Sequence, residues 1–207
     1  ASLLPKYRGA APIQWALMNG DSSTGVSIFQ IEKKVDTGKI IFQEAIKIKN
    51  EDNFETLSIK LSTLGGGALI KSLEMLNKDK TNLIIQNNSK FTLAPKINKD
   101  MLKINWSWEG EKINNWVRGL SPYPAMYTLY KEKKIKIFKV QLLKKVSNSH
   151  PGKIELIDSK KLIIHSKNYQ VSVLELQQEG KKRLKIEDFL KGSNFEKGQN
   201  FSYDANS

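Results

Sequence analysis

The first quarter of the chain alternates between short apolar runs and polar or glycine-containing turns, which predicts several short elements. Pro12 opens a short helical pattern over residues 13–19, and a glycine follows it, as proline favours the first turn of a helix and glycine its end. Residues 25–31 are rich in β-branched side chains and predict a strand. Residues 40–48 predict a second strand, and the Val-Asp-Thr-Gly turn at residues 35–38 predicts a β-hairpin between them.

A long helix is predicted from residue 52 onwards. Asp52 and Glu55 have the spacing of a capping box, which marks a helix N-terminus. Apolar residues then recur at helical spacing and predict a stripe facing the core: Leu57, Leu61, Leu64, Ala68, Leu69, Leu73 and Leu76. Three glycines at residues 65–67 lie within this pattern, whereas a phosphate-binding loop requires a preceding strand and a following Gly-Lys-Ser/Thr. We therefore reject a phosphate loop and expect close helix packing, at a cost of about 1 kcal/mol for each glycine.

The second half of the chain predicts mainly strands. Periodicity is lost between residues 77 and 95, an Asn- and Lys-rich stretch that predicts a linker. A short helix is predicted at residues 111–120 and a helical turn at residues 186–192. Short strands are predicted at residues 125–130, 135–140, 153–157, 161–165 and 171–176. The sequence thus predicts an α/β unit over residues 1–92, linker included, and an OB-like β-barrel domain, a fold that often binds nucleic acid, over residues 93–207.

Composition narrows the class of protein. The 207 residues contain no cysteine, which excludes a disulfide scaffold, a thiolate metal site and a cysteine nucleophile. No apolar run approaches the length of about 18 residues that spans a bilayer, and no signal-peptide pattern is present. The chain opens at Ala1 and not at a methionine. We therefore expect a cytoplasmic protein that does not enter a membrane and whose true beginning is missing.

The charge is unevenly distributed between the two halves. Residues 1–92 carry 12 Lys and Arg against 9 Asp and Glu, a net charge of +3, whereas residues 93–207 carry 22 against 12, a net charge of +10. A compositional preference for lysine explains why 31 of the 34 basic residues are lysine, but it does not explain the gradient. A basic second half beside a nearly balanced first half is typical of one domain that does chemistry and another that holds a polyanion.

Few side chains are candidates for catalysis. His150 lies in a predicted loop and His165 in a predicted strand, and neither has a partner at metal-ligand spacing, so both are expected to be structural or surface residues. No nucleophile-elbow motif is present. Asp36 remains, in a glycine-bounded turn directly after a strand, although a turn also favours Asp for local hydrogen bonding. Aspartic proteases share the Asp-Thr-Gly tripeptide but require two such carboxylates, and only one is present.

Linked motifs in both halves resemble the formyltetrahydrofolate-dependent transformylases. Those in the first half are Ser-Leu-Leu-Pro-Lys-Tyr-Arg-Gly-Ala-Ala-Pro-Ile at residues 2–13, Gly-Val-Ser-Ile at 25–28 and Val-Asp-Thr-Gly at 35–38. Those in the second half are Ile-Asn-Trp-Ser at residues 104–107, Arg-Gly-Leu-Ser-Pro-Tyr-Pro at 118–124, Leu-Gln-Gln-Glu-Gly-Lys-Lys at 176–182 and Phe-Leu-Lys-Gly at 189–192. The chain as a whole resembles the C-terminal portion of the methionyl-tRNA formyltransferase family. This implies an α/β remnant of the formyltransferase core, a β-hairpin plus helices, before the barrel.

The resemblance implies formyl transfer from 10-formyltetrahydrofolate, as co-substrate and without a metal, to the α-amino group of methionyl-initiator tRNA in translation initiation. Asp36 matches the family's catalytic aspartate, which would orient an imidazole and help move a proton. The residues that match the folate-contacting segment are Ser2, Leu3, Leu4 and Pro5. The residues expected to contact tRNA are Lys6, Arg8, Arg118, Lys181 and Lys182. The implied partners are initiator methionyl-tRNA and the folate, and the protein is expected to be a monomer.

One departure from the family pattern concerns the catalytic side chains. The family's catalytic Asn and His lie immediately upstream of the Ser-Leu-Leu-Pro segment, and this chain starts directly after that His, with Ala1 in place of the usual Gly. We therefore expect the chain by itself to be inactive. Two alternatives stay open: another folate-dependent formyltransferase, acting on a sugar nucleotide or on glycinamide ribonucleotide, and a non-catalytic RNA-binding module.

Overall fold

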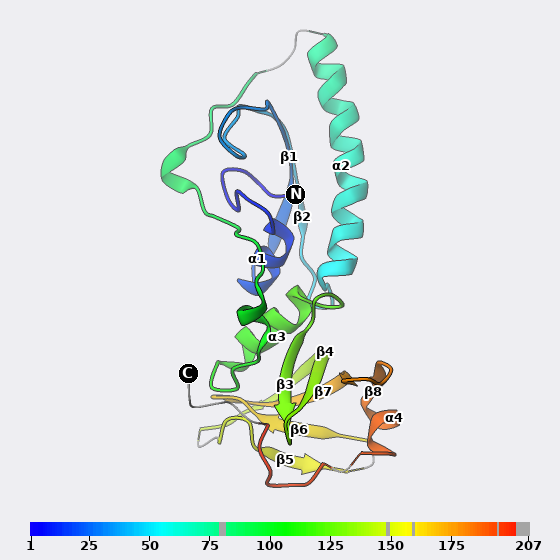
Figure 1. The fold of residues 1–207 in the computed structure, drawn as a ribbon. Coiled ribbons are helices and arrows are strands. Elements are labelled where there is room, and N and C mark those ends of the chain that lie inside the picture. The colour runs from blue at the N-terminus through cyan, green and yellow to red at the C-terminus, as the bar shows by residue number, and fades with distance from the viewer. Residues whose placement is uncertain (79–81, 148–149, 159, 194, 202–207) are drawn as a thin grey trace. The chain divides into compact units, whose positions relative to one another are not determined.

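The computed structural model describes residues 1–78, 82–147, 150–158, 160–193 and 195–201 (Figure 1). The chain divides into two compact units, Ala1–Ile97 and Asn98–Ser207. The boundary thus lies five residues beyond the one expected after residue 92. Each unit is described by itself below.

The first unit is built on a β-hairpin covered by helices. The helix α1 (Pro12–Met18) precedes the strands β1 (Ser23–Phe29) and β2 (Ile40–Lys47), which pair antiparallel with Gly25 opposite Ala45. The long helix α2 (Phe54–Asn77) follows. The predicted hairpin and both helices are therefore confirmed, with their bounds shifted by one or two residues.

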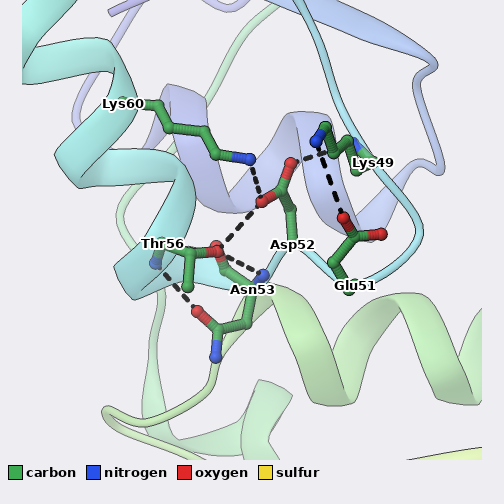
Figure 2. A network of polar contacts seen from close by, with 6 residues as sticks. All are labelled: Lys49, Glu51, Asp52, Asn53, Thr56 and Lys60. Carbon is green, nitrogen blue, oxygen red and sulfur yellow. Dashed lines mark hydrogen bonds and ion pairs between the residues drawn. The ribbon is translucent and has the colours of Figure 1, made fainter.

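The N-terminus of α2 is capped by Asn53 and not, as expected, by Asp52. The Asn53 side chain accepts a hydrogen bond from the Thr56 N–H at 2.9 Å, and the Thr56 hydroxyl accepts one from the Asn53 N–H at 3.0 Å, so the capping box uses Thr56 in place of Glu55. Figure 2 shows Asp52 directed instead toward Lys60, whose Nζ lies 2.6 Å from Oδ1, toward the Thr56 hydroxyl at 3.1 Å and toward the Lys49 N–H at 2.9 Å. Burial alone would raise the pKa of Asp52, but the hydrogen bonds from Lys60, Lys49 and Thr56 lower it below its ordinary value.

Only the first half of the apolar stripe on α2 lies in the core. Its buried members, Leu57, Leu61 and Ala68, pack with Leu17 of α1 and Val26 of β1. Leu64 is partly buried against the same cluster, whereas the last three members of the stripe are exposed, with exposed fractions of 48% for Leu69, 52% for Leu73 and 40% for Leu76. The prediction that the whole stripe is core is therefore wrong for the last turns of the helix, because nothing in the described part of the chain covers that face.

The three glycines of α2 are helical, so the rejection of a phosphate loop is confirmed. Close packing does not explain them. A Cβ on Gly65 would meet Val26 Cγ1 at an ordinary 3.8 Å, and a Cβ on Gly66 or Gly67 would meet no described atom within 4 Å.

Residues 84–94, expected to be part of a linker, instead return across the first unit. The main chains of Ile84 and Ile40 exchange two hydrogen bonds of 2.9 Å, which places the returning segment beside the start of β2. Further along, the Arg8 N–H donates to Thr92 O at 2.9 Å and the Ala94 N–H donates to Arg8 O at 2.8 Å. The 3-10 helix η1 (Asn88–Lys90) lies between these two pairings. The segment therefore connects the hairpin to the glycine-containing loop at residues 6–11.

The second unit is a curled antiparallel sheet with helices. After the 3-10 helix η2 (Lys99–Leu102) and α3 (Gly110–Gly119) come the six strands of the sheet: β3 (Met126–Tyr130), β4 (Lys133–Lys145), β5 (Ile154–Ile157), β6 (Leu162–His165), β7 (Tyr169–Gln178) and β8 (Leu184–Lys185). A short helix, α4 (Ile186–Leu190), follows β8. The sheet order is β3-β4-β7-β6-β5, with β8 also paired to β7. The strands are confirmed, but the OB-like barrel is not, since no pairing between the described residues of β3 and β5 closes the sheet.

Apolar side chains at alternating positions along these strands form the core of the second unit. Trp106 is fully buried, and its indole N–H donates to the Thr128 hydroxyl at 3.1 Å, so its polar atom is satisfied inside the core. The same unit also buries the side chains of Ile104, Ile113, Met126, Ile135, Ile137, Leu162, Ile164, Val171, Val173 and Leu176. Register shifts between β4 and β7 at Ile137/Lys139, Lys139/Val140 and Leu142/Lys145 accompany the curl of the sheet.

Candidate active site

The Asp36 turn has a conformation that few residue types tolerate. Asp36 adopts a φ of 55°, a left-handed conformation in which Asp and Asn are enriched among non-glycine residues. Gly38 is required for another reason, because a Cβ there would lie 1.7 Å from the Gln30 carbonyl oxygen. The turn that closes the β1–β2 hairpin therefore presents a half-buried carboxylate at a fixed position of the chain.

A second loop holds the carboxylate of Asp36. Gly9 has a φ of 130°, and its N–H donates to Asp36 Oδ2 at 2.9 Å. A Cβ on Gly9 would lie 2.7 Å from the Ala94 carbonyl oxygen, so only glycine fits between the Asp36 turn and the returning segment. The loop at residues 6–11 and the Asp36 turn, 27 residues apart in sequence, are thus joined at the carboxylate.

Gln86 fixes the main chain of the same turn. Its amide Nε2 donates to the carbonyl oxygens of Asp36 at 3.0 Å and of Gly38 at 2.7 Å. Its Oε1 accepts two hydrogen bonds from the Arg8 guanidinium, from Nε at 3.2 Å and from Nη2 at 2.7 Å. Gln86 is only 6% exposed. We call this arrangement of Arg8, Gln86, Asp36 and Gly38 the Gln86 clasp.

Sequence reasoning missed Gln86 altogether. It lies in the stretch interpreted as a linker, where no periodicity distinguishes it from the neighbouring polar residues. Its partners lie 50 and 78 residues away along the chain. The only sequence signal is a turn with buried carbonyl groups that need donors, and that signal does not say which residue supplies them.

The segment at residues 2–5 is attached to the hairpin through its main chain. The Leu4 N–H donates to the Ser27 hydroxyl at 3.0 Å, that hydroxyl donates to Ser2 O at 2.6 Å, and Gln43 Nε2 donates to Leu4 O at 2.9 Å. Ser2 and Leu4 are buried. Leu3 and Pro5, with Lys6 and Tyr7, line a pocket of about 240 Å³. Of the predicted folate-contacting residues, the structure therefore places Leu3 and Pro5 at a pocket and buries the other two.

Tyr7 connects this pocket to the end of α1. Its hydroxyl donates to Asp21 Oδ2 at 2.9 Å and accepts a hydrogen bond from Asn19 Nδ2 at 3.0 Å. Burial and the neighbouring Asp21 raise the pKa of Tyr7, although the bond from Asn19 acts in the opposite direction.

The residues predicted to contact tRNA are spread over several elements. In the first unit Lys6 is exposed, whereas Arg8 is buried in the Gln86 clasp. In the second unit Arg118 lies on α3, where its Nε donates to Asn115 Oδ1 at 3.0 Å. Lys181 and Lys182 are exposed in the turn between β7 and β8, and Lys181 lines a pocket of about 240 Å³ together with Tyr130 and Phe189.

The two histidines lie in the second unit. His150 is exposed in a loop, and His165 Nε2 contacts Glu155 Oε2 at the β5–β6 pairing. The described residues contain no group of three or more His, Cys, Asp and Glu side chains arranged to hold a metal ion. None of the helices described is long and apolar enough to cross a membrane.

Both units match one protein family. The formyl transferase family matches residues 1–73, and the formyl transferase C-terminal domain matches residues 96–194. The methionyl-tRNA formyltransferase of Flavobacterium johnsoniae is 42% identical over 201 residues, which cover 94% of this chain and 63% of the relative. That of Thermodesulfovibrio yellowstonii is 41% identical over 198 residues, 96% of this chain and 63% of the relative. This chain therefore spans slightly less than two thirds of the length of these curated relatives.

Solved structures share the fold at lower identity. The N-formyltransferase from Helicobacter canadensis, in complex with folinic acid and dTDP-3-aminofucose, superimposes with a TM-score of 0.66 at 21% identity, over 83% of this chain and 63% of that one. HypX from Aquifex aeolicus, in complex with tetrahydrofolic acid, superimposes with a TM-score of 0.68 at 15% identity, over 96% of this chain and 37% of that one. At such identities the likeness concerns the fold alone. The sequence matches in both units are decisive, and the chain belongs to the formyl transferase family.

Proposed function

We propose that this chain forms the larger part of an enzyme that transfers a formyl group from 10-formyltetrahydrofolate to the α-amino group of methionine on initiator tRNA. The observation that carries the proposal is the extent of the identity to relatives named methionyl-tRNA formyltransferase, 38 to 42% over 94 to 96% of this chain. That match includes the basic second half, where residues 93–207 carry a net charge of +10. A polyanionic acceptor such as tRNA accounts for that charge.

Asp36 is proposed to act on the proton of the attacking amine. An ammonium group cannot attack a carbonyl carbon, so the amine must lose a proton, and the leaving nitrogen must gain one. The Gly9 N–H fixes one carboxylate oxygen of Asp36 at 2.9 Å, and the Gln86 clasp fixes the main chain beneath it. The family resemblance implies a histidine directly before the position of Ala1. A carboxylate held in this way would orient and charge-balance that imidazole.

The segment at residues 2–5 is proposed to form one wall of the folate site. Its donors and acceptors at Ser2 and Leu4 are already used by Ser27 and Gln43, so these two residues would hold the segment in place. Leu3 and Pro5 would contact the ligand, and the apolar surface they share with Tyr7 in the pocket of about 240 Å³ suits a flat ring system. Bound there, the folate supplies the activated formyl group.

The test is a chimera in which this chain replaces the matching region of the Flavobacterium johnsoniae relative. With 10-formyltetrahydrofolate and methionyl-tRNA, we expect formylmethionyl-tRNA, and we expect Asp36→Asn to reduce the rate by about 10²–10⁴-fold, the usual contribution of a group that transfers a proton. Asp100→Asn, at an exposed carboxylate of η2, is the matched control and should keep the rate. Formylation of a dTDP-amino sugar in place of methionyl-tRNA, or an unchanged rate in Asp36→Asn, would contradict the proposal.

A further inference from the structure

Arg8 is a buried cation whose described partners are all neutral. The residue is 8% exposed, and its guanidinium donates to Gln86 Oε1 and to Asn88 Oδ1, the latter at 2.9 Å. In the part of the chain that the structure describes, no carboxylate lies within ion-pair distance of it. Its remaining nitrogen, Nη1, has no acceptor among the same residues. The Asp36 carboxylate is engaged by the Gly9 N–H and does not reach the guanidinium.

A guanidinium in this situation favours an anion. Arginine stays protonated in proteins, so burial does not remove the charge, and an uncompensated charge is costly to withdraw from water. Neutral amide oxygens satisfy its N–H donors but cannot neutralise it. An anion bound against the guanidinium would compensate the charge and use the donors that remain. The fold therefore maintains a fixed positive site immediately behind the Asp36 turn.

Arg8 faces a pocket with two further cations. The pocket has a volume of about 420 Å³ and is lined by Arg8, Lys34, Lys39, Glu32 and Thr37, together with residues of the returning segment. Three basic side chains against one acidic side chain leave the lining with a net charge of +2. Lys34 and Lys39 are exposed and lie on either side of the Asp36 turn, so their ammonium groups can reach a ligand seated on Arg8.

The same pocket has an apolar side. Phe91 and Ile85 line it and are 47% and 76% exposed, so their apolar surface is available to a ligand. The Arg8 guanidinium lies 5.5 Å from the centre of the Phe91 ring, so charge and aromatic surface are adjacent. An aromatic face beside basic groups is the arrangement that binds a nucleobase and its phosphate together.

We propose that this pocket binds a phosphate group of a nucleotide on Arg8, Lys34 and Lys39, with the base against Phe91. The proposal deepens the proposed function, on which its choice of ligand rests: the nucleotide would be the 3′-terminal part of the acceptor RNA, whose aminoacyl group must reach Asp36. The nucleoside diphosphate of a sugar nucleotide has the same phosphate chemistry. The binding experiment therefore includes both sources.

The test measures equilibrium binding to the 207-residue chain by calorimetry, with the trinucleotide CCA, dTDP, inorganic phosphate and adenosine as separate probes. We expect CCA to bind more tightly than phosphate or adenosine alone. The double variant Lys34→Gln and Lys39→Gln should weaken CCA binding about tenfold and make the dependence of log K on log salt shallower by about 0.7 for each lysine removed. Both lysines are exposed, so folding should be unaffected.

Controls separate the pocket from general basicity. Lys33→Gln removes one positive charge, against two in the double variant, at the residue next to Lys34 and outside the pocket lining, and should leave binding nearly unchanged. Phe91→Ala should weaken CCA binding and not phosphate binding.

Equal weakening by Lys33→Gln, or no binding of any phosphate-bearing probe at low salt, would overturn the proposal. If dTDP binds and CCA does not, the pocket binds phosphate but the acceptor is not tRNA. If CCA binds but the chimera does not formylate methionyl-tRNA, the pocket is supported and only the proposed function is contradicted.

Discussion

The two units are stabilised by different kinds of contact. In the first unit the Asp36 turn is held by hydrogen bonds from Gly9 and Gln86, residues 27 and 50 positions away in sequence. In the second unit the sheet is held by apolar side chains that alternate along neighbouring strands, and Trp106 is fully buried in the same unit. Hydrogen bonds depend on direction and fix individual atoms, whereas apolar burial depends on area and supplies most of the free energy of folding.

This difference suggests how chemistry and stability are divided in the chain. A carboxylate that moves a proton must keep its position closely, and the Gln86 clasp provides such control over the Asp36 main chain. The proposed binding of RNA by the second unit would require mainly a stable platform for its surface charges. Substitutions should therefore affect free energy most in the second unit and local geometry most in the first.

The largest loss of stability is expected for Trp106→Ala in the second unit. The substitution leaves a cavity and deprives the buried Thr128 hydroxyl of its partner, so the free energy of unfolding should fall by about 3–5 kcal/mol. Urea unfolding, with hydrogen exchange read at the amides of β3 and β4, measures the loss. Leu143→Ala, at a side chain that is 42% exposed, is the control and should change little. A loss below about 1 kcal/mol for Trp106→Ala would show that the core does not depend on this side chain.

A smaller and pH-dependent loss is expected for Asp52→Asn at the start of α2. The substitution replaces the anionic partner of the Lys60 ammonium, 2.6 Å away, by a neutral amide, which should cost about 2–4 kcal/mol at neutral pH. Because the folded-state pKa of Asp52 is lowered, the stability that its charge provides is present above the ordinary pKa of about 3.9 and is lost as the pH falls through the lowered value.

The difference in unfolding free energy between the wild type and Asp52→Asn should therefore shrink as the pH is lowered below about 4. Urea unfolding at a series of pH values measures it, with Glu51→Gln, at an exposed neighbour, as the control. A difference that stays constant over that range would mean that the charge of Asp52 does not stabilise the fold.

Features that depend on local sequence period could be predicted. The hairpin, α2 and the strands of the second sheet each follow from apolar spacing and turn residues. The cap of α2 was misplaced by one residue, because Asp52 and Asn53 are both good capping residues and only the three-dimensional contact with Lys60 decides between them. The end of the apolar stripe was misjudged because spacing shows which face of a helix is apolar, not whether another element covers it.

The residues of the candidate site could be predicted from the sequence only where a local sequence pattern marks them. Asp36 could be singled out by its turn, and the catalytic role assigned to it stays a prediction. Gln86 and the burial of Arg8 could not be foreseen, because a buried amide contributes no periodicity and its partners are distant in sequence. Hydrogen bonds between distant segments are fixed by the fold as a whole, so they become visible only in the structure.

Gln86→Leu should cost less stability than the two substitutions above but should change the Asp36 turn more. It removes both donors to the carbonyl oxygens of Asp36 and Gly38 and the acceptor for Arg8, for an expected loss of about 1–3 kcal/mol. Relative to the wild type, hydrogen exchange should accelerate more at the amides of the Asp36 turn than at other amides of the first unit. Asn82→Leu, at an exposed position of the same segment, is the control. Unchanged exchange at the turn would show that the Gly9 contact alone fixes Asp36.

Gly66→Ala on α2 should give the smallest effect, and Gly9→Ala in the same unit should have the opposite sign. Gly66→Ala places a methyl group in open space on a helix, so it should raise the free energy of unfolding by about 0.5–1 kcal/mol through helix propensity alone. Gly9→Ala should lower it, because the φ of 130° is strained for alanine and its Cβ would meet the Ala94 oxygen. Thermal unfolding of both variants measures the contrast. A destabilised Gly66→Ala would mean that this exposed face of α2 is covered in solution, by another copy of the chain or by a partner, and the exposed Leu69 and Leu73 would then belong to the same interface.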